Sequence, residues 1–322
     1  MAVIDAFEVL RPGILTTVQD LGRPGFAHYG VAPSGALDGF ALRVANLLAG
    51  NPEDTAALET AVMGLRLKAL RDVVVAVTGA NLKPMKGREP LAMWRSHRIR
   101  AGEVIAFSGP AGGMRSYVAV PGGIEVPQVL GSRSTNLPSG FGGFAGRALR
   151  QGDILRCTVV ENELQFAGRA FEPAWIPEYP SQWRLRVIWG PQDDQISEDG
   201  RQAFVTGTFS VSPDSDRTGI RLKGPAVARQ PGLPESIISE GVIAGAIQIP
   251  GDGQPIIILG ETATGGYRKI ATVISADLPL LGQIMPGNEV AFSAVALDDA
   301  VQALRESEEK IGEFKKRLAA LT

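Results

Sequence analysis

The chain has 322 residues, of which 44% are apolar and 20% charged, and its 32 basic and 34 acidic side chains leave a net charge of −2. This length favours two domains, each large enough to bury its own core. The balanced charge, without a basic stripe that also carries aromatic residues, argues against nucleic acid as a partner.

Few side chains are available for metal or disulfide chemistry. Cys157 stands alone, which excludes an internal disulfide and a thiolate zinc site, and His28 and His97 are too few for a histidine-rich metal site. Asp5 and Glu8 occupy the segment where a signal peptide needs a basic start and an apolar core. No apolar run approaches the roughly 20 residues of a membrane helix. We therefore expect a cytoplasmic protein with no metal site and no membrane segment.

Glycine and proline are spread between short β-branched runs, a pattern typical of a mostly β fold with a few helices. In chain order, the predicted strands cover residues 13–18, 65–69, 73–78, 104–107, 117–120, 154–159, 184–189, 246–249, 255–259 and 289–292. The strands at 104, 154 and 289 each follow a similar glycine-containing turn. We therefore expect related hairpins in both halves of the chain.

Two amphipathic helices are expected. Apolar residues recur at a spacing of three and four from Leu37 to Leu48, and Gly50 provides the stop. A second apolar stripe runs from Leu297 to Leu318. This C-terminal helix packs either on its own domain or on a partner.

A proline-rich connector separates the two halves. Three prolines and two aromatic residues stand between Phe171 and Trp183, which indicates a stiff linker. We therefore expect an N-terminal domain at residues 1–172, a C-terminal domain at residues 183–296 and the helix at residues 297–322.

Polar side chains gather before the first predicted helix. Asp20 and Arg23 stand among glycines, and Ser34 and Asp38 lie at the helix start. Ser34 or Asp38 is either a helix cap or part of an anion site, because the exposed amides of a helix start suit a carboxylate.

Arg133 lies between Ser132 and Ser134, ahead of a glycine-rich segment at residues 141–146. It either pairs with a surface acid or holds a carboxylate or phosphate as a fork. The order G-x-x-x-x-G-K-[ST] is absent from the chain, so nucleotide binding by this chain alone is unsupported.

The densest polar segment covers residues 211–224 and contains Asp214, Asp216, Arg217 and Arg221 around a proline turn. It is either a solvated turn held by an ion pair of Asp216 with one of the arginines, or part of a site. Its similarity to the polar segments elsewhere favours the site.

Glu240 and Gln248 interrupt an apolar segment at residues 238–251, which we expect to form a double strand. Polar groups in such surroundings need partners, so they either tie the sheet together or face a cavity.

Gly265, Gly266, Tyr267 and Lys269 follow the strand predicted at residues 255–259. They form either a backbone nest for an anion or a wide hairpin loop with its lysine in solvent.

An ordered set of motifs carries a family resemblance. The motifs lie at residues 17–25, 30–38, 76–80, 116–123, 130–135, 190–192, 212–219, 239–241 and 264–267. Together they resemble the biotin-dependent carboxyltransferase family of the KipA type, related to allophanate hydrolase subunit 2 and to the C subunit of bacterial 5-oxoprolinase. The resemblance runs from about Val9 to about Phe292 and implies two cyclophilin-like β-barrels with the active cleft between them.

The resemblance also implies work with partners, namely a KipI-like subunit and a LamB/YcsF-like subunit. The leading hypothesis is a subunit of an ATP-dependent 5-oxoprolinase that hydrolyses 5-oxoproline to glutamate, with ATP bound by or shared with a partner. One alternative is carboxyl transfer from carboxybiotin to urea or a related amide, with the biotin carried by another protein. The other is a KipA-type regulatory module that binds a KipI-like kinase inhibitor.

Residue chemistry suggests roles within the 5-oxoprolinase hypothesis. The candidate catalytic residues are Asp20, Asp214, Arg217 and Glu240, and the candidate substrate-binding residues are Arg23, Ser34, Asp38, Arg133, Ser134, Gln248, Gly265, Gly266, Tyr267 and Lys269. Arg133 or Arg217 would hold the substrate carboxylate, and Asp214 or Glu240 would orient water. Backbone amides near Gly265 would stabilise developing negative charge.

In the carboxyl-transfer alternative, Lys269, Tyr267 and Gln248 would line a pocket for the biotin ureido ring. The chain departs from the family at one place: residues 260–264 lack the usual Gln-Thr pair, and Arg268 stands where a proline is common. A role for that glutamine is therefore not carried over, and we expect the substrate to differ accordingly.

Overall fold

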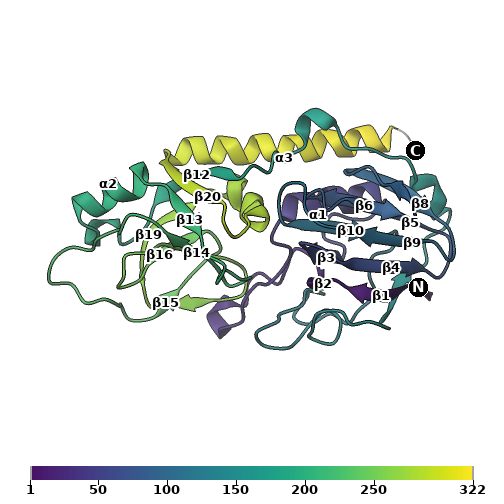
Figure 1. Cartoon of the computed structure of the whole chain (residues 1–322), viewed down its shortest axis with the longest axis horizontal. Helices are drawn as coiled ribbons and strands as arrows, with labels where there is room; N and C mark the ends of the chain where they lie inside the picture. Colours follow the sequence, from purple (N-terminus) through teal and green to yellow (C-terminus); the bar gives the residue numbers. More distant parts are fainter. Residues whose placement is uncertain (1, 321–322) are drawn as a thin grey trace. The chain divides into compact units, whose positions relative to one another are not determined.

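The computed structural model describes residues 2–320 (Figure 1). The chain forms two compact units. Unit 1 comprises the chain up to Arg23, Ser34–Tyr179 and the chain from Ile311, and unit 2 comprises Pro24–Pro33 and Pro180–Lys310. The expected mostly β fold is confirmed in both units.

Two sheets form unit 1 within the described residues. The first, in the order β11-β1-β4-β9-β6-β7, consists of β1 (Val3–Pro12), β4 (Leu65–Ala69), β6 (Pro84–Lys86), β7 (Glu89–Pro90), β9 (Val104–Phe107) and β11 (Ile154–Thr158). The second, in the order β2-β3-β10-β5-β8, consists of β2 (Leu15–Gln19), β3 (Ala57–Ala61), β5 (Val73–Gly79), β8 (Arg95–Ile99) and β10 (Arg115–Ala119).

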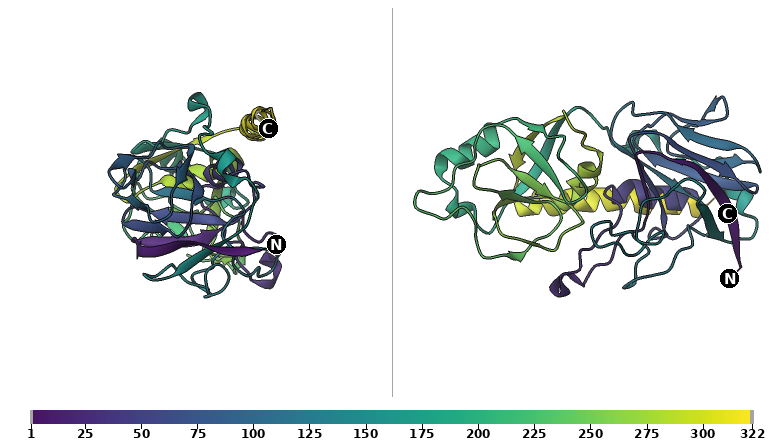
Figure 2. Two further views of the ribbon diagram at one scale, coloured as in Figure 1. Left: turned by 90° about the vertical axis from the view of Figure 1, so that its right-hand side faces the viewer. Right: turned by 60° about the horizontal axis from the view of Figure 1, so that its bottom comes forward.

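Apolar side chains from both sheets form one core cluster, which includes Val9, Leu67 and Val75. The helix α1 (Gly39–Leu48) packs on the five-stranded sheet, and the right view of Figure 2 shows it in purple beside the strands of unit 1. Every residue of β5 is buried, because the strand has packed neighbours on both of its faces. The sequence therefore shows an uninterrupted apolar run there instead of an alternating one.

Seven strands close a barrel in unit 2, in the order β12-β19-β16-β17-β14-β13-β20. They are β12 (Gln182–Trp189), β13 (Phe209–Val211), β14 (Gly219–Lys223), β16 (Ala246–Ile249), β17 (Ile256–Ile258), β19 (Arg268–Val273) and β20 (Glu289–Ala294). Trp183, Leu185 and Val187 alternate with exposed residues along β12 and point into the core. A two-stranded ribbon, β15 (Glu240–Gly241) with β18 (Thr264–Gly265), accompanies the barrel.

Two further helices have different partners. The helix α2 (Glu198–Thr206) begins at its cap Ser197 and stacks Phe204 on Phe292 of β20, with ring centroids 4.4 Å apart. The C-terminal helix α3 (Leu297–Ala319) packs Ala300 against unit 2 residues and Phe314 against the unit 1 core. From the sequence we expect packing on the helix's own domain or on a partner; the helix instead contributes its first part to unit 2 and its last part to unit 1. Short 3₁₀ turns complete the chain: η1 (Ala27–Tyr29), η2 (Glu163–Phe166), η3 (Pro173–Trp175), η4 (Asp193–Gln195) and η5 (Ser275–Gln283).

The prediction that residues 238–251 form a double strand is wrong, because the two strands in this segment pair with other strands and not with each other. Residues 240–241 pair with β18 in the ribbon, whereas residues 246–249 pair with β17 and β19 in the barrel. Gly245 separates them with a left-handed φ of 86°, which turns the chain before β16 begins. Among residues 2–320, none of the helices combines the length and apolarity needed to cross a membrane.

Candidate functional site

A groove of about 570 Å³ in unit 2 brings together five of the residues nominated from the sequence. These are Asp214, Gln248, Gly265, Gly266 and Tyr267. The groove is also lined by Ser212, Asp216, Thr262 and Thr264. Three separate segments of the chain thus meet at one concave surface, which we call the barrel groove.

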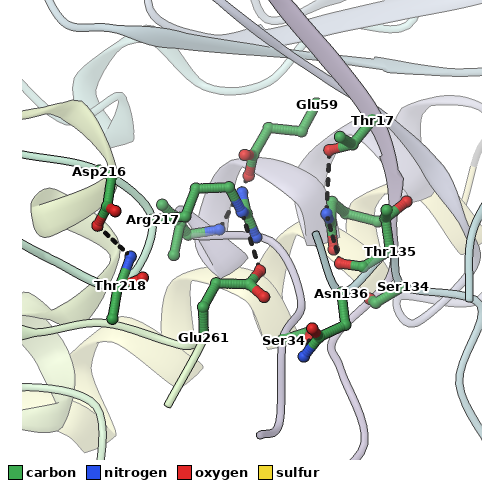
Figure 3. A network of polar contacts seen from close by, with 12 residues as sticks. Thr17, Ser34, Glu59, Ser134, Thr135, Asn136, Asp216, Arg217, Thr218 and Glu261 are labelled. Atoms are coloured by element: carbon green, nitrogen blue, oxygen red, sulfur yellow. Dashed lines mark hydrogen bonds and ion pairs between the residues drawn. The ribbon is translucent and has the colours of Figure 1, made fainter. Parts of the chain in front are cut away.

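The first wall of the barrel groove is the turn after β13. Asp216 Oδ1 accepts hydrogen bonds from the backbone amides of Thr218 at 2.7 Å and Gly219 at 3.1 Å (Figure 3). The Ser212 hydroxyl donates to Asp214 Oδ2 at 3.1 Å. The turn is therefore held by its own backbone and not by the ion pair expected for Asp216, which leaves Asp214 exposed at the groove.

A buried ion pair joins this turn to the opposite wall. Arg217 Nε lies 3.0 Å from Glu261 Oε1, with the arginine side chain 5% exposed and the glutamate side chain fully buried (Figure 3). Glu261 precedes Thr262 and Thr264 of the groove lining. The pair thus fixes the two walls of the groove with respect to each other. The sequence drew attention to the segment of Glu261 only as a departure from the family pattern.

Gln248 on β16 forms the floor of the barrel groove. Its side chain is 4% exposed, and within residues 2–320 its Nε2 has no hydrogen-bond partner. The amide lies against Gly265, where a Cβ atom would overlap it. A buried donor without a partner is costly, by about 1–3 kcal/mol, so it marks a position suited to an acceptor on a ligand.

Lys269 and Glu240 lie beside the groove as an ion pair. Lys269 is 7% exposed, and its Nζ contacts Glu240 Oε1, which also accepts from Gln192 Nε2 at 2.7 Å. The hydrogen bond from Lys269 lowers the pKa of Glu240 below its ordinary value. The interpretation of a lysine in solvent is therefore wrong. The backbone nest is also absent at Gly265, which is extended in β18 opposite Glu240.

In unit 1, Asp20 is surrounded by donors. Its Oδ1 accepts from the hydroxyls of Ser132 at 2.6 Å and Ser134 at 2.5 Å and from the amide of Gly22 at 2.8 Å. Its Oδ2 accepts from the amide of Arg133 at 2.5 Å. The carboxylate therefore fastens the segment at residues 132–134 to the end of β2. A catalytic role for Asp20 stays a prediction.

Arg23 and Arg133 lie in the same part of unit 1 with different surroundings. Arg23 is 1% exposed, donates from Nη2 to the carbonyl of Ser134 and places its guanidinium 4.8 Å from the centroid of the Phe141 ring. Arg133 Nη2 lies 3.6 Å from Glu125 Oε2 and is one-third exposed. Arg133 thus pairs with an acid near the surface, the simpler of the two expectations.

The residues before α1 include a helix cap. Asp38 Oδ1 accepts from the backbone amide of Ala41 at 2.8 Å, which confirms the capping interpretation. Ser34 is buried with a left-handed φ of 55° and accepts from Asn136 Nδ2 at 3.1 Å. Gln19 Nε2 donates to the carbonyl of Thr135 at 3.3 Å. Figure 3 shows Ser34, Thr135 and Asn136 in the same network of polar contacts.

Glu59 is one of several buried acids that the sequence analysis did not nominate. Glu59, 3% exposed on β3, accepts from the Tyr117 hydroxyl at 2.7 Å and from the Leu37 amide at 2.9 Å. Burial, together with the negative charges of Glu59 and Asp38, raises the pKa of Tyr117 well above its ordinary value. The available signal was a single charge inside the short strand, which alone does not distinguish a buried acid from an exposed one.

Relatives of known name cover nearly all of this chain. It is 35% identical over 314 residues to the C subunit of 5-oxoprolinase from Escherichia coli, covering 97% of this chain and 98% of that relative. It is 33% identical over 297 residues to the C subunit of 5-oxoprolinase from Haemophilus influenzae, covering 91% and 92%.

Longer proteins contain a similar segment. The crystal structure of the Kluyveromyces lactis urea carboxylase matches with a TM-score of 0.90 and 31% identity, covering 98% of this chain and 29% of that protein. The urea amidolyase of Lachancea kluyveri is 33% identical over 333 residues, covering 94% of this chain and 18% of that protein. The profile of the carboxyltransferase domain, subdomain A and B, matches residues 29–294. The chain therefore belongs to this carboxyltransferase domain family.

Proposed function

We propose that this chain is the C subunit of an ATP-dependent 5-oxoprolinase, which hydrolyses 5-oxoproline to glutamate together with partner subunits. The observation that carries the proposal is the end-to-end match to two proteins named as C subunits of 5-oxoprolinase, at 97% and 91% of this chain. The urea amidolyase and urea carboxylase relatives are several times longer and contain much that this chain does not match.

We assign the ATP-dependent activation of the lactam to the partner subunits. The barrel groove is lined by the carboxylates of Asp214, Asp216 and Asp252 and by the cations of Arg221 and Lys223. Three negative charges against two positive ones do not suit a triphosphate, which binds where amides and cations predominate. The partners that we expect are a KipI-like and a LamB/YcsF-like subunit.

The groove itself suits the lactam. The amide of Gln248 donates to the ring carbonyl oxygen, because a buried donor gains a partner there when substrate binds. Asp214, exposed beside it, accepts a proton from the attacking water. Water adds to the carbonyl carbon of the activated lactam, the ring C–N bond breaks, and Asp214 returns the proton to the nitrogen, which becomes the amine of glutamate. A second water then releases the phosphoryl group from the new carboxyl group as phosphate.

The remaining nominated residues act around this centre. We propose that Arg217 is a positioning residue that acts through Glu261, since their buried ion pair joins the two walls of the groove. Glu240 and Lys269 hold β15 and β19 next to Gly265. Tyr267, 38% exposed, offers its ring to the apolar face of the lactam.

The test is an assay of the complete complex. The purified chain with its partner subunits should release glutamate and phosphate from 5-oxoproline and ATP, and Asp214→Asn should lower the turnover at least about 100-fold, as removal of a general base does. Asp199→Asn, on the exposed side of α2, is the matched control and should change nothing. Full activity of Asp214→Asn, or of Arg217→Ala, would contradict these assignments.

Carboxyl transfer is the second candidate, favoured by the similarity to urea carboxylase along the whole chain. In that reaction Gln248 donates to a ureido carbonyl, which is chemically similar to a lactam carbonyl. A biotin carrier and urea would then replace 5-oxoproline as substrates. Carboxylation of urea by the chain with a carboxylated biotin carrier, without any ATP-dependent lactam hydrolysis, would favour this candidate. Binding of a KipI-like partner without turnover of any lactam or amide would instead indicate a regulatory module.

A further inference from the structure

A second cavity of about 350 Å³ lies in unit 2 next to the barrel groove, with which it shares the lining residues Pro250 and Asp252. It is lined by the loop at residues 226–233 and the turn at residues 249–253. Ile196, Val227 and Ile249 supply buried apolar surface. Arg268, the first residue of β19, also lines the cavity, which we call the Arg268 cavity.

Arg268 is a buried cation with neutral partners. Its side chain is 2% exposed, its Nε donates to Gln195 Oε1 at 2.9 Å, and its Nη1 donates to the carbonyl of Pro234 at 2.7 Å. In the part of the chain that the structure describes, no carboxylate forms an ion pair with Arg268. Two of the five guanidinium N–H groups thus have protein acceptors, and the positive charge has no counterpart.

The other charged groups near the Arg268 cavity are more exposed than Arg268. Arg229 Nη2 lies 3.7 Å from Glu235 Oε1, and both side chains are more exposed than Arg268. Asp252, also exposed, accepts from the backbone amide of Gln254 at 3.0 Å. Arg217, buried in the same unit, has the carboxylate of Glu261. A buried charge is normally paired, so Arg268 is the exception that calls for a partner.

We propose that the Arg268 cavity binds a small monocarboxylate. The carboxylate accepts from the free edge of the Arg268 guanidinium in the forked geometry that arginine favours, and a short apolar body lies against Ile196 and Ile249. A single buried cation matches one carboxylate. Asp252 in the lining and Glu235 beside Gly251 add negative charge, which disfavours phosphates and other ligands of higher charge.

The proposed ligand would act on the barrel groove through the residue next to Arg268. Tyr267 lines the groove, and Arg268, which follows it directly and begins β19, lines the cavity. A carboxylate held by Arg268 would therefore fix the backbone that carries Tyr267. This makes the cavity a second binding site for a regulator, and its existence does not depend on which reaction the groove performs.

Binding is tested on the purified chain with butyrate as the probe and butyramide as its uncharged counterpart. Isothermal titration should give a measurable Kd for butyrate, at least about tenfold lower than for butyramide, which lacks the charge that pairs with Arg268. Thermal unfolding should shift upward with butyrate concentration, as for any ligand of the folded state. No binding of butyrate, or equal binding of the two probes, would overturn the proposal.

Variants locate the site. Arg268→Leu should abolish butyrate binding, whereas Arg268→Lys, which keeps the charge without the fork, should weaken it at least about tenfold. Arg184→Leu, an exposed arginine on β12, is the control and should bind as the unchanged chain does. If Arg268→Leu does not fold, as judged by circular dichroism, Arg268→Lys decides: an unchanged Kd overturns the proposal, and a weakened Kd supports it.

Discussion

The contact between Gln248 and Gly265 allows the proposed lactam site to be tested by a double-mutant cycle. A Cβ at Gly265 would overlap the Gln248 amide, yet Gly265 lies in an extended strand whose backbone accepts alanine. Gly265→Ala therefore moves the Gln248 amide out of the groove without straining the main chain. Gln248→Leu removes the same donor directly.

The expected size follows from what the donor contacts. A hydrogen bond to a neutral carbonyl contributes about 0.5–1.5 kcal/mol, or up to about 12-fold in rate. A donor aimed at an oxygen that gains negative charge in the transition state contributes about 2.7–4 kcal/mol, or roughly 100- to 1,000-fold. If Gln248 acts as proposed, Gln248→Leu should therefore lower kcat/KM by about 100-fold or more. Gly265→Ala should lower it similarly and add little to Gln248→Leu, because both changes remove one interaction.

The assay is ATP-dependent glutamate formation by the chain with its partner subunits, with kcat and KM measured separately. Gly241→Ala is the matched control, since Gly241 lies in the partner strand β15 and a Cβ there meets nothing within 4 Å. The urea-unfolding midpoints of all variants should stay close together. Independent, additive losses from Gly265→Ala and Gln248→Leu would refute the reasoning, and so would an effect below twofold for Gln248→Leu.

Two further predictions concern buried and partly buried ion pairs. Glu261→Gln should reduce the free energy of unfolding by about 3–5 kcal/mol in urea, because it removes the negative charge from a buried ion pair. A loss below about 1 kcal/mol would argue against this. Two hydrogen bonds from Arg147 to the carboxylate of Asp153, at 2.8 and 2.9 Å, lower the pKa of Asp153 in the folded state. The stability that this ion pair contributes is therefore present above the ordinary aspartate pKa, and it is lost as pH falls through the lower pKa of the folded state. Urea midpoints measured as pH falls below about 4 should therefore drop less for Asp153→Asn than for the unchanged chain, and parallel curves would count against the assignment.

Strands could be predicted from the sequence where a short apolar run stands between turn-forming residues. The ranges at residues 65–69, 104–107 and 246–249 agree with β4, β9 and β16, because apolar residues there are bounded by turn-forming ones. The helix α2 was not predicted, since its sequence is mostly polar and only Gly200 and Phe204 are buried. Its position depends on the stacking of Phe204 on Phe292, a contact between residues far apart in the chain.

The residues of the candidate site could be nominated from the sequence, but the side chains that they pair with could not. Asp214, Gln248 and Tyr267 were nominated separately, and the structure brings them to one groove. The pairing of Arg217 with Glu261 could not be inferred, because 44 residues separate them and a local aspartate offered an equally plausible partner. Polar residues in glycine-rich loops thus indicate which segments form the candidate site. The ion pairs and hydrogen bonds between these side chains depend on long-range contacts, which the sequence does not reveal.

The hydrogen bonds of Asp20 have a consequence for the order of folding. Asp20 and Ser132 are 112 residues apart, so their contact requires closure of a long loop, which carries a large entropic cost early in folding. Contacts of this kind tend to form after the local hairpins, late on the folding pathway. Loss of the Asp20 carboxylate should then accelerate unfolding and leave the refolding rate nearly unchanged, so this carboxylate sets how long the native state persists rather than how quickly it is reached.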